Sequence, residues 1–129
     1  MKRIVMAAVV FAGLLMPAPG RAASTVPVFM SNLKFCATPV CATNGNVTVV
    51  AGDTVAWVYA DGLCTALAAL GCFHTTTRST APTWNSGPMP GPGGVGTTVL
   101  FQRTFSTRGS FFYICSVHGA SMSASIIVT

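Results

Sequence analysis

Three side chains that bind soft metal ions lie close together near the end of the chain. Cys115 ends an apolar run, and His118 follows Cys115 after two intervening residues. Met122 precedes another β-rich run. Sulfur ligands hold Cu(I) and imidazole accepts both copper oxidation states, so this set suits copper better than zinc. The sequence has one other histidine, His74, in a separate strand-like run at 72–77. Two histidines, one cysteine and one methionine are the ligands of a blue-copper site. We therefore predict one copper ion bound by His74, Cys115, His118 and Met122.

Each of these residues also has a simpler interpretation. A histidine in a β domain is usually exposed or hydrogen-bonded. His74 becomes a ligand candidate because the chain also contains Cys115 and His118. Met122 could instead fill a gap in the core, because methionine packs well in irregular spaces. Met89 and Met30 are the alternative axial ligands.

Strands must position the ligands, because the chain beyond residue 23 has almost no helical periodicity. We expect strands at 28–35, 46–50, 54–59, 72–77, 98–105, 111–115 and 125–128, and one helical turn at 66–70. Residues 84–94 are rich in Pro and Gly, which indicates an ordered, exposed loop rather than a central strand. Side chains alternate along a strand, so Val55, Trp57 and Tyr59 should face the interior. Thr54, Ala56 and Val58 should then face outward or toward the edge of the other sheet. By the same rule Phe111, Tyr113 and Cys115 should point inward.

The first 23 residues have the features of an export signal. A basic start at residues 1–3 precedes an apolar run at 4–16, and small residues follow, with cleavage expected after Ala22 or Ala23. The apolar run is too short to span a bilayer comfortably, and no twin arginine is present. The sequence therefore predicts a single domain at 24–129 that is periplasmic or secreted and is not inserted in a membrane after processing.

Charge excludes one class of partner. Processing would leave four basic residues against two acidic ones, a net charge of +2. Nucleic-acid binding requires a basic stripe, which this chain lacks.

Five cysteines in an exported chain leave one thiol unpaired. Four cysteines allow three pairings, and closeness in sequence favours Cys36–Cys41 and Cys64–Cys72. Cys115 would then be free to bind metal.

The order of several segments resembles the cupredoxins, in particular small carriers of the plastocyanin, amicyanin and pseudoazurin type. The segments that carry the resemblance are 49–57, His74-Thr75, 84–87 and 113–122. The resemblance implies a Greek-key β-sandwich with a single type 1 copper ligated by His74, Cys115, His118 and Met122. It also implies that His118 reaches the surface through an apolar patch, with Pro88, Met89, Pro90 and Gly119 as neighbours. Thr75 or Asn85 could donate a hydrogen bond to the thiolate. The segment between Trp57 and His74 is longer than in the small carriers, and the gap between His118 and Met122 varies among subfamilies.

We expect a monomeric one-electron carrier that docks transiently with redox partner proteins near His118, and no enzyme activity. The alternative is a periplasmic protein that stores or delivers copper with the same ligands. A c-type haem protein would need Cys-x-x-Cys-His, which is absent here. A zinc hydrolase would need an open site and a general base, yet only Asp53 and Asp61 supply carboxylates. A metal-free sandwich would take up no copper.

Overall fold

The computed structural model describes residues 20–31, 33–60, 73–90 and 99–129. Within these ranges the regular structure is entirely β, as eleven strands. They are β1 (Thr25–Ser31), β2 (Lys34–Cys36), β3 (Val47–Val49), β4 (Thr54–Tyr59), β5 (Phe73–His74), β6 (Thr77–Arg78), β7 (Trp84–Asn85), β8 (Met89–Pro90), β9 (Val99–Thr104), β10 (Gly109–Cys115) and β11 (Gly119–Val128).

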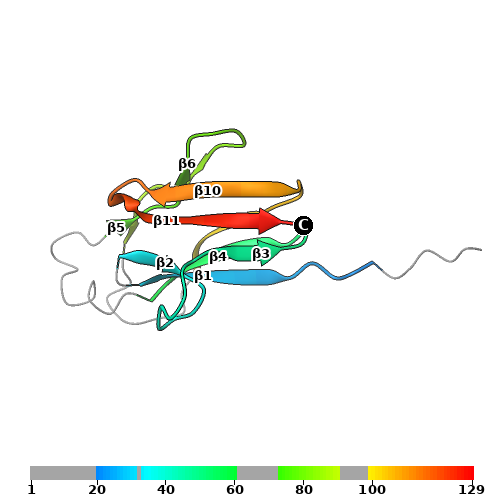
Figure 1. Cartoon of the computed structure of the whole chain (residues 1–129), viewed down its shortest axis with the longest axis horizontal. Coiled ribbons are helices and arrows are strands. Elements are labelled where there is room, and N and C mark those ends of the chain that lie inside the picture. Colours follow the sequence, from blue (N-terminus) through cyan, green and yellow to red (C-terminus); the bar gives the residue numbers. More distant parts are fainter. Residues whose placement is uncertain (1–19, 32, 61–72, 91–98) are drawn as a thin grey trace, which may run out of the picture.

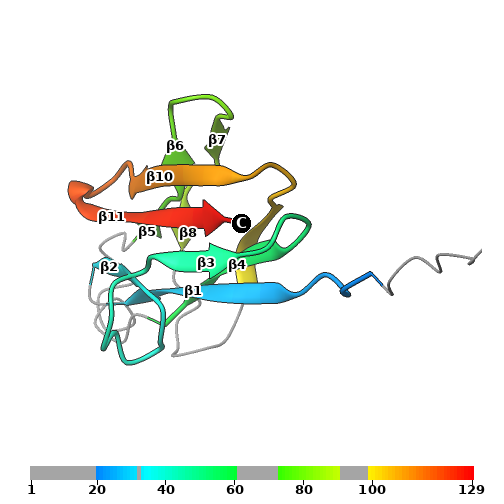
Figure 2. The ribbon, with the colours of Figure 1, turned by 45° about the vertical axis from the view of Figure 1, so that its right-hand side comes forward.

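The strands form two main sheets that lie against each other (Figure 1). One has the order β2-β1-β4-β9 and the other β3-β11-β10-β6-β7, while β5 and β8 form a separate pair. Both main sheets are mixed, because β1 runs parallel to β4 and β3 runs parallel to β11. The chain therefore crosses between the sheets instead of forming successive hairpins, and the predicted all-β Greek-key sandwich is confirmed. The turned view shows the β10–β11 loop and β5 at one end and the β9–β10 turn at the other (Figure 2).

The core lies between the two sheets. Val55, Trp57 and Tyr59 are buried as expected, and the Trp57 ring meets the edge of Tyr113 from the opposite sheet with 5.5 Å between ring centroids. Ala56 and Val58 are buried as well, so of the two orientations expected for them the outward, exposed one is excluded. Alternation predicts which side chains share a face of a strand, but not whether a second face is covered.

Three other expectations about strands need correction. The expected strand at 28–35 is a hairpin of β1 and β2, with a turn at Leu33, where φ is 57°. The expected strand at 72–77 is divided between β5 and β6, which belong to different sheets. The region from Trp84 to Pro90, expected to be a loop, contains the short strands β7 and β8. β7 lies at a sheet edge, where Pro- and Gly-rich sequence is tolerated.

A disulfide joins Cys36 to Cys41, as predicted, and Cys115 is free and buried. Disulfides are typical of proteins in oxidising compartments. The Cys64–Cys72 pairing, the helical turn at 66–70, residues 1–19 of the predicted signal and residues 91–94 lie outside the described residues. Among the described residues there is no helix with the length and apolar character needed to cross a bilayer.

Candidate metal centre

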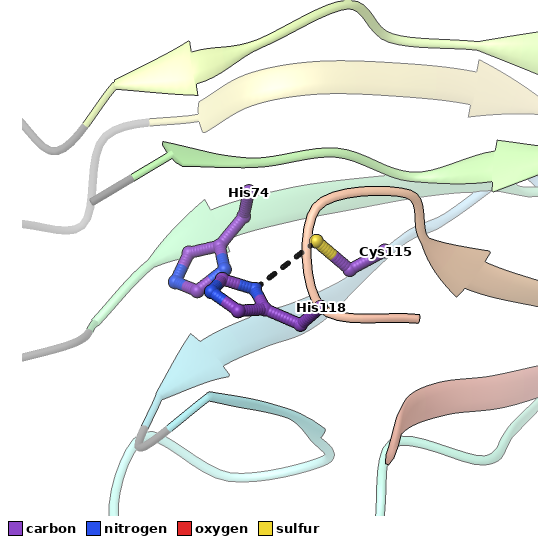
Figure 3. A group of neighbouring side chains, drawn as sticks. All are labelled: His74, Cys115 and His118. Carbon is purple, nitrogen blue, oxygen red and sulfur yellow. Dashed lines mark hydrogen bonds between the residues drawn. The ribbon is translucent and has the colours of Figure 1, made fainter. Parts of the chain in front are cut away.

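His74, Cys115 and His118 converge at one end of the sandwich. Their ligand atoms, one from each side chain, all lie within 4.8 Å of one another. The Cys115 sulfur is 3.4 Å from Nδ1 of His118. Figure 3 shows both imidazole rings beside the sulfur, with His74 approaching from a separate segment of the chain. The structure thus brings together three of the four predicted ligands.

The end of β10 places Cys115. Phe111, Tyr113 and Cys115 are all buried, as alternation predicts. The pairing of β10 with β11 shifts register after Ile114, so that Cys115 pairs with Gly119. Gly119 has a φ of 66°, a conformation that glycine adopts without strain, and it allows the chain to reverse tightly after His118. This reversal returns the His118 ring toward the thiol three residues earlier.

His74 is fixed from the other side of the site. It lies in β5 opposite Met89 of β8, and its side chain is fully buried. Its ring lies 5.6 Å from the Tyr59 ring and 5.0 Å from the His118 ring, centroid to centroid. A buried imidazole held between two rings has little freedom to leave the site.

Thr75 joins the two ligand loops. Its backbone N–H donates to the Cys115 sulfur at 3.3 Å, and its hydroxyl oxygen accepts from the Ser116 N–H at 2.7 Å. The same hydroxyl lies 2.9 Å from the Ser116 hydroxyl. Thr75 is therefore the donor anticipated for the thiolate, although through its backbone. Asn85 instead uses its side-chain oxygen to accept from Thr77 and Gly87, away from the sulfur.

The contribution of Ser116 was not anticipated from sequence. The available signal was its position, because Thr75 and Ser116 each directly follow a predicted ligand.

The surroundings of Cys115 favour its thiolate. Burial raises the pKa of this thiol, but hydrogen bonds from the His74 side chain, the Thr75 N–H and His118 outweigh burial and lower the pKa to about 6. The thiolate is the form of cysteine that binds metal. The site therefore holds its sulfur in the ligating state at neutral pH.

Met122 is fully buried in the core cluster that also contains Cys115. Met30 and Met89 are buried in the same cluster. The axial role of Met122 therefore stays a prediction.

The three convergent donors fit a copper ion. Zinc sites show typical metal–nitrogen and metal–sulfur bonds of about 2.0–2.3 Å, and donors arranged around an ion at such distances lie about 3.5–4 Å apart. The Cys115 sulfur and His118 Nδ1, 3.4 Å apart, are close to that range, and all three ligand atoms lie within 4.8 Å of one another. Trigonal His₂Cys coordination is the donor set of blue-copper sites. Asp53 is the one carboxylate side chain among the described residues, and it does not belong to this cluster, so it does not compete as an oxygen ligand.

Apolar side chains next to the histidines are exposed at this end of the molecule. Val117, beside His118, is 52 % exposed, and Phe73, beside His74, is 39 % exposed. His118 itself is partly exposed. Pro88 is exposed, whereas Met89 is only 3 % exposed and cannot be a surface neighbour as expected.

The fold is similar to that of amicyanin. A methionine-to-alanine mutant of amicyanin in its Cu(I) form aligns with a TM-score of 0.58 at 18 % identity, over 84 % of this chain and 86 % of that chain. A reduced tryptophan-to-tyrosine mutant gives the same TM-score, identity and coverage. An oxidised proline-to-alanine mutant gives 0.57 at 18 %, over 81 % and 82 %.

No protein-family model matches the chain, and no curated protein matches it in sequence. The likeness to amicyanin is thus one of structure, at low sequence identity. It confirms at the level of the fold the resemblance noted in the sequence: this chain has the cupredoxin β-sandwich.

Proposed function

We propose that this protein is an exported one-electron carrier with a single type 1 copper ion. The observation that carries the proposal is the convergence of His74, Cys115 and His118 at one end of a cupredoxin fold. The ion would supply reversible one-electron chemistry between Cu(I) and Cu(II). The role of the chain is to hold the donors in one arrangement that suits both oxidation states.

Rigid support of the ligands favours a carrier. Cys115 is fixed by strand pairing and by the Thr75 N–H, while His74 is buried between rings. Ligands that move little when the charge of the ion changes keep the reorganisation on electron transfer small. Hydrogen bonds to a metal-bound sulfur also tune its potential.

The proposed docking surface for redox partners is the site end of the molecule. Val117 and Phe73 are exposed apolar side chains directly next to the two histidines. An apolar surface with few charges suits short-lived association. We expect Val117→Asp to slow electron exchange with a partner while leaving the visible spectrum unchanged. A charge at Met89 would not test this surface, because that side chain is buried.

The decisive test of a carrier is retention of copper through a full redox cycle. The protein loaded with Cu(II) is reduced by one electron, dialysed, reoxidised by one electron, and its copper is counted by mass spectrometry at each stage. A carrier keeps one copper per chain and recovers its full absorption. Loss of the ion from the reduced protein to a Cu(I) acceptor would instead indicate a protein that delivers copper.

A further inference from the structure

Basic side chains outnumber acidic ones among the described residues. Asp53 supplies their one side-chain carboxylate, and it is 1 % exposed and paired with Arg21 at 2.8 Å. Arg78, Arg103 and Arg108 have no carboxylate partner within the described parts of the chain. Together with the aromatic side chains that they border, Phe105, Phe111 and Phe112, these three residues form what we call the arginine face.

Aromatic rings hold two of the guanidinium groups in place. The Arg103 guanidinium carbon lies 5.1 Å from the Trp84 ring and 5.9 Å from the Phe105 ring, and that of Arg78 lies 5.5 Å from the Phe111 ring. The Phe105 and Phe111 rings are neighbours, with centroids 5.4 Å apart. The two arginines thus flank one aromatic pair. The Arg78 guanidinium also donates to the backbone carbonyl oxygens of Phe112 at 2.7 Å and Ala81 at 3.5 Å, so part of its edge is already used. The stacked Arg103 guanidinium keeps the N–H donors at its edge available and is oriented before a partner arrives.

A small hollow lies beside each of these arginines. One, of about 140 Å³, is lined by Arg103 together with the hydroxyl side chains of Thr104, Ser106 and Thr107. The other, of about 150 Å³, is lined by Arg78, Ser79 and Thr80 among others, and by Phe112, which is 53 % exposed. Each hollow therefore combines a guanidinium, hydroxyl donors and an aromatic wall. That combination suits a carboxylate at the end of a side chain, because arginine binds carboxylates with two parallel hydrogen bonds.

The end of the arginine face that carries Arg103 and Arg108 lies away from the metal centre, whereas the hollow beside Arg78 extends to Ile114, the residue before Cys115. Strand β10 runs from the β9–β10 turn, which carries Arg108, to Cys115 at the opposite end (Figures 1 and 2). Its seven residues span roughly 20 Å. A partner seated on this face would leave His118 and Val117 open.

We propose that the arginine face binds an acidic protein surface, with one carboxylate side chain entering the hollow beside Arg103 and Arg78 adding positive charge at its border. Three positive groups are too few for the stripe that tracks a phosphate backbone, which argues against nucleic acid. A hollow with a free guanidinium edge and hydroxyl donors fits a discrete carboxylate better than the flat array of lipid headgroups. This inference concerns a second surface, and it stands whether or not the protein binds copper.

The test uses nuclear magnetic resonance of the isotope-labelled protein with poly-L-glutamate as the probe. We expect amide shifts to concentrate between Arg103 and Phe112 and around Arg78. We expect the double variant Arg78→Gln/Arg103→Gln to weaken binding about fivefold to tenfold, because partly exposed ion pairs each contribute little binding free energy. The matched control is Lys34→Gln, which removes one positive charge elsewhere and should change the affinity less than twofold.

A second variant separates recognition by the guanidinium from general charge attraction. Arg103→Lys keeps the charge but loses the planar fork, and we expect it to weaken binding about threefold with an unchanged melting temperature. This variant also serves if the double variant fails to fold. Equal affinity of Arg103→Lys and the wild type would overturn the proposal, as would shifts centred on Lys34 or His118. Tighter binding of single-stranded DNA or phosphatidylglycerol vesicles through the same residues would reassign the face.

Discussion

At the scale of single residues, the hydroxyl of Thr75 connects the loop of one histidine to the loop of the cysteine. We expect Thr75→Val to lower the free energy of unfolding by about 0.5–1.5 kcal/mol, because the partly buried Ser116 N–H loses its acceptor. We also expect the visible band of the copper protein to shift. Thr75→Ser is the matched control, since it keeps the hydroxyl, and it should behave like the wild type. Equal unfolding curves for the two variants in urea would show that the hydroxyl bridge does not stabilise the site.

The predicted axial role of Met122 has a spectroscopic test. Met122→Leu should keep the visible band, since the thiolate bond dominates it, and should raise the reduction potential, because a weak donor that favours Cu(II) is lost. Met30→Leu provides the control, because Met30 is also fully buried in the core. A potential that changes equally in both variants, or in neither, would contradict the assignment of Met122.

The metal ligands could be predicted from residue types, but the contacts that support them could not. His74, Cys115 and His118 could be selected because few residues in the chain bind soft metals, and their order along the sequence limits the possibilities. The bridge from Thr75 to Ser116 could not be predicted in the same way. It depends on two loops that lie 41 residues apart in sequence and meet only in the folded sandwich.

At the scale of elements, the Cys36–Cys41 disulfide closes the loop after β2. Replacing both cysteines with alanine should lower the free energy of unfolding by about 2 kcal/mol, the loop-closure entropy for a loop of this length. Copper binding should be unchanged, because neither cysteine is near the three ligands in sequence or belongs to their cluster. Denaturation in guanidinium chloride and a copper titration measure both quantities. A double variant that loses copper while it remains folded would mean that the disulfide loop supports the site.

The prediction succeeded for β4 and β10, whereas the ten-residue β11 was expected only at 125–128, because its first six residues include no β-branched or aromatic side chain. The strand expected at 54–59 is β4, and the expected run at 111–115 lies within β10, because both runs are rich in β-branched and aromatic residues and long enough to indicate a strand. β5, β6, β7 and β8 have two residues each, too few for any period to appear. Their pairing is decided by tertiary contacts, which explains why the run around His74 was assigned to one strand.

At the scale of the whole molecule, Asp53 ties the N-terminal segment to the sandwich. The Arg21 guanidinium, followed by the N–H groups of Ser24 and Val50, holds the pKa of the Asp53 carboxyl below its usual range. A carboxyl with a lowered pKa stabilises the fold above the pKa it has in the unfolded chain, about 3.9. This contribution disappears as the pH falls toward the value in the folded state.

We therefore expect Asp53→Asn to lower the melting temperature at pH 7, in a chain that keeps Arg21. The difference from the wild type should narrow as the pH falls from 5 to 2. Arg21→Gln should show part of the same effect, because the two backbone N–H donors remain. Melting temperatures that differ by a constant amount across this range would contradict the role of the carboxylate.

We propose that the Cys115 thiolate and two imidazoles from distant parts of the chain share one copper ion. The most direct measurement adds Cu(II) to residues 24–129 and records the visible and electron paramagnetic resonance spectra of the wild type, Cys115→Ser and His74→Ala. We predict a blue protein with one copper per chain in the wild type, and loss of the blue band in both variants. A blue band that survives in Cys115→Ser would contradict the account.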